Sequence, residues 1–202
     1  MAAILQSLRN TVVAGFVLAL VVFIVMGLIG KYTLGFKLEF WQLLFRWLHV
    51  ASGVMWIGML YYFNFVQMPS MPKIPDEQKP AVSKVIAPTA LFWFRWAAMS
   101  TIITGLILAH LNKYLLDAIL IGIPSGFGGR ETMIGIGMWL GTIMWFNVWF
   151  IIWPNQKKAL GLVEADADTK KKAARTAMLF SRTNTMLSVP MLFCMISAQN
   201  PY

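Results

Sequence analysis

Long blocks of apolar residues, each bounded by charged residues, are the feature of this sequence that most restricts its fold. A helix that crosses the hydrocarbon core of a bilayer needs about 20 mostly apolar residues. Hydrophobic residues make up 58% of the chain and charged residues only 12%, which is far from the balance of a soluble domain. We therefore predict an all-α integral membrane protein, a bundle of about five transmembrane helices in a single domain, 1–202. The predicted spans are 11–30, 42–67, 88–111, 133–153 and 178–198.

Lysine and arginine are distributed unevenly among the predicted connections. The N-terminal segment and the second and fourth connections together carry ten of these residues, whereas the opposite side carries five. Because short basic connections stay in the cytoplasm, we predict a cytoplasmic N-terminus and a periplasmic C-terminus in a bacterial inner membrane. The same asymmetry explains most of the net charge of +9, so no nucleic-acid partner is expected.

Three connecting segments have distinctive compositions. Five prolines fall in the segment 68–88, and proline disrupts a helix because it lacks a backbone N–H and clashes with the preceding turn. We therefore predict an extended cytoplasmic connection there. The glycine-rich stretch 122–129 predicts a flexible outer loop without the Gly-Lys-Ser/Thr ending of a phosphate-binding loop. The segment 164–175, acidic and then basic, predicts a solvated helix near the lipid headgroups.

The chain has two histidines, and both are predicted to lie in the outer half of the membrane. His49 lies about two turns into the second span from its outer end, and His110 closes the third span. Imidazole is a common axial ligand of haem, so two facing histidines can hold one haem b between helices. Gly53 and Gly105 remove side chains where a flat macrocycle needs room. His49 and His110 are therefore the candidate cofactor-binding residues and the candidate ligands of a haem iron.

A plainer interpretation of the histidines stays open. His49 can instead form a hydrogen bond with a neighbouring helix, and His110 can simply lie in the membrane interface. A methionine such as Met55 or Met99 can also serve as the second axial ligand. Most of the fourteen methionines, however, are expected to fill the core.

A second group of polar residues is predicted in the inner half of the membrane. Arg95 lies within the aromatic block 93–96, Arg182 lies at a similar depth in the fifth span, and Asn155 ends the fourth span. Two guanidinium groups with amides and aromatic planes suit a planar anion, because arginine binds such a group through two parallel hydrogen bonds. Haem propionates and phospholipid headgroups fit the same groups, and so does a plain belt of interfacial residues. The candidate substrate-binding residues are Arg95, Arg182, Asn184 and Asn155.

Several kinds of chemistry are not expected from this sequence. The single cysteine, Cys194, cannot form an internal disulfide, a CxxC redox pair or a cysteine-held iron-sulfur cluster. The chain has no HExxH motif and no predicted Ser-His-Asp set, so a hydrolase is not expected. Its acidic residues lie in connections and at span ends, which argues against a proton-coupled transporter.

Three stretches together resemble one known family, the bacterial PuuD-type urate hydroxylases, which are membrane-bound, cytochrome-c-linked urate oxidases. The stretches are WLHVASGVMWIG at 47–58, NVWFIIWPNQKK at 147–158 and SRTNTMLSVPMLFCMIS at 181–197, with the block at 93–96 in the same pattern. The resemblance is to the membrane domain of that family and covers roughly residues 40–200. The stretch LH followed by WIG also occurs in other small membrane haem proteins, including the membrane protoporphyrinogen oxidases.

The resemblance implies a urate-oxidising oxidoreductase that passes electrons to a cytochrome c on the outer side. Members of the family carry a C-terminal cytochrome domain with a CxxCH motif, and this sequence contains no CxxCH. A separate cytochrome is therefore expected to accept the electrons. The resemblance matches His49 to the family's span-two histidine. It matches the polar positions of the family to Arg95, Asn155, Arg182 and Asn184.

Two functions of different classes follow from these observations. The first is a membrane redox protein that binds haem b at its outer side and meets a substrate at its inner polar residues. The second is a non-catalytic accessory subunit of a larger respiratory or other energy-converting membrane complex, whose nine tryptophans pack against partner spans. The expected partners are therefore the lipid bilayer and either cytochrome c or such a complex.

Overall fold

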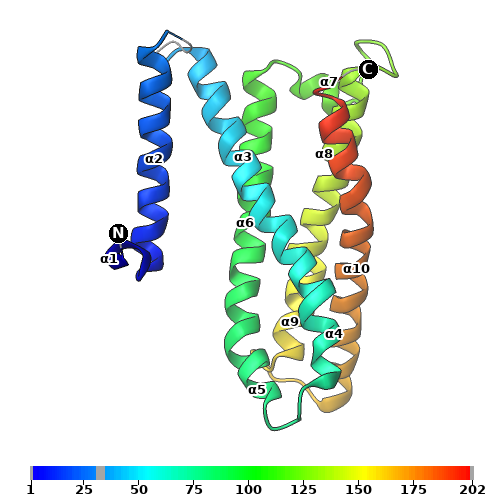
Figure 1. The fold of residues 1–202 in the computed structure, drawn as a ribbon. Helices are drawn as coiled ribbons and strands as arrows, with labels where there is room; N and C mark the ends of the chain where they lie inside the picture. The colour runs from blue at the N-terminus through cyan, green and yellow to red at the C-terminus, as the bar shows by residue number, and fades with distance from the viewer. Residues whose placement is uncertain (1, 31–34, 201–202) are drawn as a thin grey trace. The chain divides into compact units, whose positions relative to one another are not determined.

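The computed structural model describes residues 2–30 and 35–200, and every regular element in those ranges is helical (Figure 1). The prediction of an all-α fold is therefore confirmed for the described part of the chain. The helices divide into two compact units, Met1–Trp41 and Gln42–Tyr202. Each unit is described by itself.

The first unit is dominated by one apolar helix. It contains α1 (Ala2–Leu5), α2 (Leu8–Leu28) and the first turn of α3 (Leu38–Tyr61). Ser7 caps α2, and none of the residues of α2 is buried. A helix that is apolar on all sides and unburied in its own chain is suited to a lipid environment. The rings of Phe23 and Phe40, 5.7 Å apart, join α2 to the start of α3.

The second unit contains four long helical runs and one short helix, α7 (Leu115–Ile119). Along the chain, consecutive long runs alternate in direction, as Figure 1 shows. The first run continues α3 through η1 (Tyr62–Gln67), α4 (Met68–Ser70) and η2 (Met71–Lys73). The second comprises α5 (Lys79–Ala81), η3 (Val82–Ile86) and α6 (Ala87–Leu111). The third comprises α8 (Arg130–Phe146), η4 (Asn147–Ile152) and α9 (Trp153–Ala159), and the fourth is α10 (Ala167–Ser197).

The proline-rich segment differs from its prediction. The first run stays helical to Lys73 and the second begins at Lys79, so most of 68–88 is helix rather than an extended connection. The prolines are accommodated by π-helical turns: η1, η3 and η4 each end two residues before a proline, at Pro69, Pro88 and Pro154. Proline cannot donate to the carbonyl four residues earlier and its ring pushes that carbonyl aside. A wider turn makes room for the displaced carbonyl, so the helix continues.

Four helical runs among the described residues are long and apolar enough to cross a membrane. These are Leu8–Leu28, Leu38–Lys73, Lys79–Leu111 and Arg130–Ala159, which contain or overlap the first four predicted spans. The fifth predicted span lies within α10, which is helical but does not meet the same length and composition test. Arg182, Asn184 and several hydroxyl side chains interrupt its apolar stretch. The crossing by α10 and the sidedness of the bundle stay predictions.

All four long runs of the second unit contribute to its core. Trp56 and Leu60 from the first run pack with Phe94 from the second and with Met144 from the third, and each of them is 2% exposed or less. Near the start of α10, the buried residue that belongs to this apolar core is Ala177. The segment 164–175, predicted as a solvated helix, is helical from Ala167, where α10 begins, and α10 runs from there without a break into the bundle.

Candidate functional site

His49 is held by the backbone of the neighbouring helix α6. Its Nδ1 atom lies 2.9 Å from the carbonyl oxygen of Thr101, and the side chain is half-buried. A carbonyl oxygen can only accept, so Nδ1 carries the proton and donates it. In the neutral ring the lone pair then lies on Nε2. This is the arrangement that orients an imidazole as a metal ligand, since the second nitrogen of such a ring is usually bonded to a carbonyl or carboxylate.

Gly105 provides the space that the His49 ring occupies. A Cβ atom at position 105 would lie 2.8 Å from Cε1 of His49 and 3.0 Å from Nδ1. The prediction assigned this space to a macrocycle, whereas the structure fills it with the imidazole itself. Gly53 has no comparable neighbour, because a Cβ atom there would meet only a methyl group of Thr101 at 4.0 Å.

His110 lies apart from this arrangement. It is exposed near the end of α6, on the helical face that also carries Ile103 and Leu106, which are 50% and 44% exposed. The period of the helix puts that face on a different side of α6 from Thr101 and Gly105. The structure therefore brings His49 into contact with α6 but does not turn His110 toward it. Of the two alternative ligands, Met55 is 44% exposed and Met99 is half-buried.

The residues around His49 fit one axial ligand of a haem, because its Nδ1–H is anchored and its Nε2 lone pair is not committed by that bond. The described residues contain no group of three or more His, Cys, Asp or Glu side chains that could hold a metal ion. Haem iron needs no such group, since the porphyrin itself supplies four ligands. The second axial ligand and the haem itself stay predictions.

Arg95 stacks on an aromatic ring that comes from another helical run. Its guanidinium carbon lies 3.3 Å from the centre of the Trp153 ring on α9. The Nε and Nη1 atoms of Arg95 are buried and have no hydrogen-bond partner among the described residues. Lys157, one turn further along α9, places its Nζ atom 5.6 Å from the centre of the same ring. Arg95 was predicted as a site residue, whereas Trp153 and Lys157 were not.

The other predicted substrate-binding residues have different surroundings. Arg182 is exposed on α10. Asn155 is half-buried and donates to the carbonyl of Ile151 in its own helical run. Asn184 is fully buried and uses both ends of its amide within the protein. The structure therefore does not gather these residues around Arg95 into one set.

Asn184 belongs to a line of buried polar side chains on one face of α10, which we call the α10 seam and which comprises Ser181, Asn184 and Ser188. Asn184 Oδ1 accepts from Asn147 Nδ2 at 2.8 Å, and Asn184 Nδ2 donates to the Met144 carbonyl at 2.9 Å. These contacts tie α10 to the third run. They are interhelical hydrogen bonds of the kind that hold membrane helices together.

The seam also ties α10 to the first run. Asn64 Nδ2 donates to Ser181 Oγ at 2.8 Å. Ser188 donates to the Thr185 carbonyl, so the Tyr61 hydroxyl, 3.0 Å away, donates to Ser188. Sequence analysis missed Tyr61 and Ser188. The spacing of small and polar residues along α10, three and four residues apart, was the pattern that could have revealed this face.

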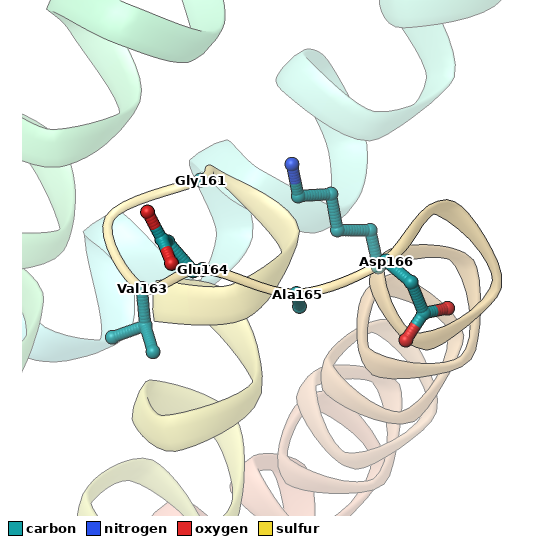
Figure 2. A pocket seen from close by; sticks show the side chains of 6 residues that line it. Gly161, Val163, Glu164, Ala165 and Asp166 are labelled. Carbon is teal, nitrogen blue, oxygen red and sulfur yellow. The ribbon is translucent and has the colours of Figure 1, made fainter.

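A shallow hollow of about 540 Å³ lies at the connection between α9 and α10 (Figure 2). Asp166 on its rim caps α10 by accepting from the Thr169 backbone N–H at 2.8 Å. Hydrogen bonds from Thr169, led by that of its hydroxyl, hold the pKa of Asp166 below its usual value. The hollow contains none of the predicted site residues, and one of its polar side chains, Asp166, has a structural role as a helix cap. Its lining residues are Gly161, Val163, Glu164, Ala165, Asp166 and Lys170.

These features define the class of the protein. In its described part it is all-helical, with helices able to cross a membrane and polar side chains buried between them. Within it, residues 114–202 match the family described as Urate oxidase N-terminal. The match supports a relation of this part of the chain to a urate-oxidase-related family. No curated protein and no solved structure matches the chain.

The matched segment covers only some of the residues described above. It begins just before α7 and contains the third run and α10, so it includes Trp153, Lys157 and the α10 seam. His49 and Arg95 lie outside it. Their interpretation therefore depends on their own contacts and on the stretches that resemble the membrane domain.

Proposed function

We propose that this chain is a membrane redox protein of the urate hydroxylase type, in which His49 holds a haem b and electrons pass to a cytochrome c on the outer side. The match of residues 114–202 supports a urate-related function. The stretches at 47–58 and 181–197 support the more specific relation to the cytochrome-c-linked membrane enzymes. In this proposal the protein acts as an oxidoreductase in a bacterial inner membrane.

The single observation that carries the haem proposal is the anchored imidazole of His49. Its bond to the Thr101 carbonyl fixes the ring between α3 and α6 and leaves Nε2 as the lone-pair nitrogen. A haem bound there supplies one-electron transfer. The contribution of this chain is to orient the ligand and to shield it within the helices, with Gly105 giving the ring its place.

The proposal assigns the substrate to the inner polar residues, with Arg95 as the first contact. Arg95 has buried donors without partners, whereas the amide of Asn184 is already committed. A planar anion can accept from the guanidinium while it lies against an aromatic ring. Arg182 and Asn155 are proposed contacts of lower rank because one is exposed and the other is bonded to its own helix.

A difference spectrum tests the proposal. Protein gently solubilised from haem-replete cells is measured in the dithionite-reduced and oxidised states, together with His49→Ala and His110→Ala variants. We expect a haem α-band in the native protein that disappears in His49→Ala and persists in His110→Ala. A native protein without a Soret band would contradict the haem proposal. A band that survives in His49→Ala would show that a residue other than His49 is the haem ligand.

Activity is tested separately by adding urate and a soluble cytochrome c to the haem-loaded protein. We expect urate-dependent reduction of the cytochrome, weakened in Arg95→Gln. If the haem band is present but urate does not reduce the cytochrome, the protein is a haem redox protein whose substrate is not urate.

A second candidate, an accessory subunit of a larger complex, is favoured by α2. None of its residues is buried, and a helix apolar on all sides packs either against lipid or against other proteins. Purification in mild detergent separates the two. A stable species with no co-migrating protein would contradict the accessory role.

A further inference from the structure

We infer that Arg95 and Lys157, gathered around the Trp153 indole, form a binding site for a phosphate oxyanion. The ligand is either the headgroup phosphate of a membrane lipid or free phosphate. The inference depends on the contacts of these side chains and stands whether or not the chain carries a haem. The site shares Arg95 with the proposed substrate contact, so phosphate and substrate compete there, but its ligand is a different one and goes beyond the redox function proposed above.

Two positive charges converge on one aromatic ring. The Arg95 guanidinium carbon lies 3.3 Å and the Lys157 ammonium 5.6 Å from the centre of the Trp153 ring, which places the two charges within about 9 Å of each other. Within the described part of the chain, the one ion pair joins Lys79 to Asp76. Neither cation at Trp153 thus has a carboxylate partner there. An anion between them would remove the repulsion of two like charges.

The donors of Arg95 reinforce this inference. Its Nε and Nη1 atoms are buried without an acceptor among the described residues, and the indole N–H of Trp149, one turn before Trp153, is in the same condition. A buried donor without a partner costs free energy, and a charged donor costs more. A ligand rich in acceptor oxygens satisfies both donors of Arg95 at once. These unpartnered donors therefore point to an oxygen-rich anion.

A phosphate group fits the geometry and the location. Guanidinium binds two phosphate oxygens through its parallel N–H groups, and lysine contributes a point charge beside them. The site lies at the end of the bundle that carries Lys158 and the basic start of α10. Such basic residues next to membrane spans attract anionic lipids. Trp96, whose ring lies 5.5 Å from that of Trp149, is 50% exposed, so a large apolar side chain is accessible on this side of the bundle.

The test measures binding of phosphatidylglycerol, phosphatidylcholine and inorganic phosphate to the full chain in neutral detergent. Native mass spectrometry counts the retained lipids, and titration calorimetry measures free phosphate. The variants are Arg95→Gln and Lys157→Gln. The matched controls are Arg46→Gln, an exposed arginine on α3, and Lys113→Gln, an exposed lysine that follows α6.

We expect Arg95→Gln to weaken anion binding about tenfold or more, because it removes charge-assisted hydrogen bonds. Lys157→Gln should weaken it about threefold, as the loss of a more exposed charge. The two controls should stay within about twofold of the native protein. Preference for phosphatidylglycerol over phosphatidylcholine would identify a lipid headgroup as the ligand. Binding of inorganic phosphate without that preference would identify a soluble anion.

The inference is overturned if neither anion binds, or if the controls lose as much affinity as Arg95→Gln. Circular dichroism checks that each variant is folded. If Arg95→Gln misfolds, Arg95→Lys and Lys157→Gln carry the test, with Arg95→Lys expected to bind more weakly than the native protein because it loses the paired N–H groups. A failed haem spectrum leaves this result unaffected, and a failed anion titration leaves the haem spectrum unaffected.

Discussion

The α10 seam and the Arg95 site both place polar groups between helices, but they differ in whether those groups have hydrogen-bond partners. In the seam, the Asn184 amide donates and accepts within the protein, and Ser188 is bonded to Tyr61 and Thr185. At the Arg95 site, two buried nitrogens have no acceptor among the described residues. The comparison teaches that a paired amide such as that of Asn184 holds helices together, whereas the unpaired charged donors of Arg95 are the ones that we propose bind a ligand.

His49 lies between these two cases. One of its ring nitrogens is bonded to the Thr101 carbonyl, as in the seam, and the other is the lone-pair nitrogen, as expected of a ligand. The same side chain is therefore anchored and available. Because the two ring nitrogens have different roles, we expect removal of the His49 side chain to affect a bound cofactor and substitutions next to the ring to affect stability.

The largest expected effect is at the centre of the seam. Asn184→Ala removes two interhelical hydrogen bonds and leaves the buried amide of Asn147 without its partner, so we expect the free energy of unfolding to fall by about 2 kcal/mol. Unfolding by SDS in mixed micelles, followed by circular dichroism, measures the change. Thr183→Ala is the control, because Thr183 bonds only to its own helix through the Leu179 carbonyl. Equal losses in both variants would show that the seam has no special role.

The second effect concerns the place of the His49 ring. Gly105→Ala puts a methyl group 2.8 Å from Cε1 of His49, so the ring must shift and its bond to Thr101 must weaken. We expect a loss of about 1 kcal/mol in the free energy of unfolding and, in haem-loaded protein, a displaced Soret band. Gly53→Ala is the matched control, since its methyl group would meet nothing closer than 4.0 Å. If Gly53→Ala has the larger effect, the role given to Gly105 is wrong.

A smaller effect is expected at the edge of the seam. Tyr61→Phe removes the hydroxyl that donates to Ser188 and keeps the ring, so we expect a loss of about 0.6 kcal/mol. The same SDS titration measures it. An unchanged unfolding midpoint would mean that this hydroxyl contributes nothing to the packing of α10.

The smallest effect on stability is expected at Arg95 itself. Arg95→Gln should leave the free energy of unfolding within about 0.5 kcal/mol of the native value, because the lost contact with Trp153 is offset by removal of an uncompensated buried charge. The unfolding titration is done without lipid or phosphate. A loss as large as that of Asn184→Ala would make Arg95 a structural residue and remove the contrast between the two regions.

Hydropathy alone located the helices well, since four predicted spans coincide with or lie inside helical runs that can cross a membrane. It failed between 68 and 88, where five prolines suggested an extended chain. Proline excludes an ordinary helical bond, but it does not exclude a widened turn, and η1 and η3 lie at the ends of this segment. Whether a helix breaks or widens at proline depends on tertiary packing, which composition does not contain.

The candidate site was predictable where neighbours in sequence are also neighbours in space. The block 93–96 places aromatic residues beside Arg95 in sequence, but the ring that Arg95 contacts, Trp153, comes from another run. Arg182 and Asn184 are two residues apart and were predicted as one set. On a helix, two residues separate side chains by about 200°, so Asn184 is buried while Arg182 is exposed. The face that α10 presents to the bundle became clear only from its partners.

The π-helical turns also change the angular phase of the runs in which they lie. Each such turn takes in about one extra residue, which rotates every later side chain by about 100° relative to a regular α-helix. In the third run, η4 begins at Asn147 and ends just before Trp153, so it lies between the seam contact and the residues around Arg95. A helical wheel drawn through the whole run would therefore assign Trp153 and Lys157 to the wrong sector. The wide turn before Pro154 thus rotates the second half of the third run relative to the first half. The first half contacts the seam, and the second half contacts Arg95.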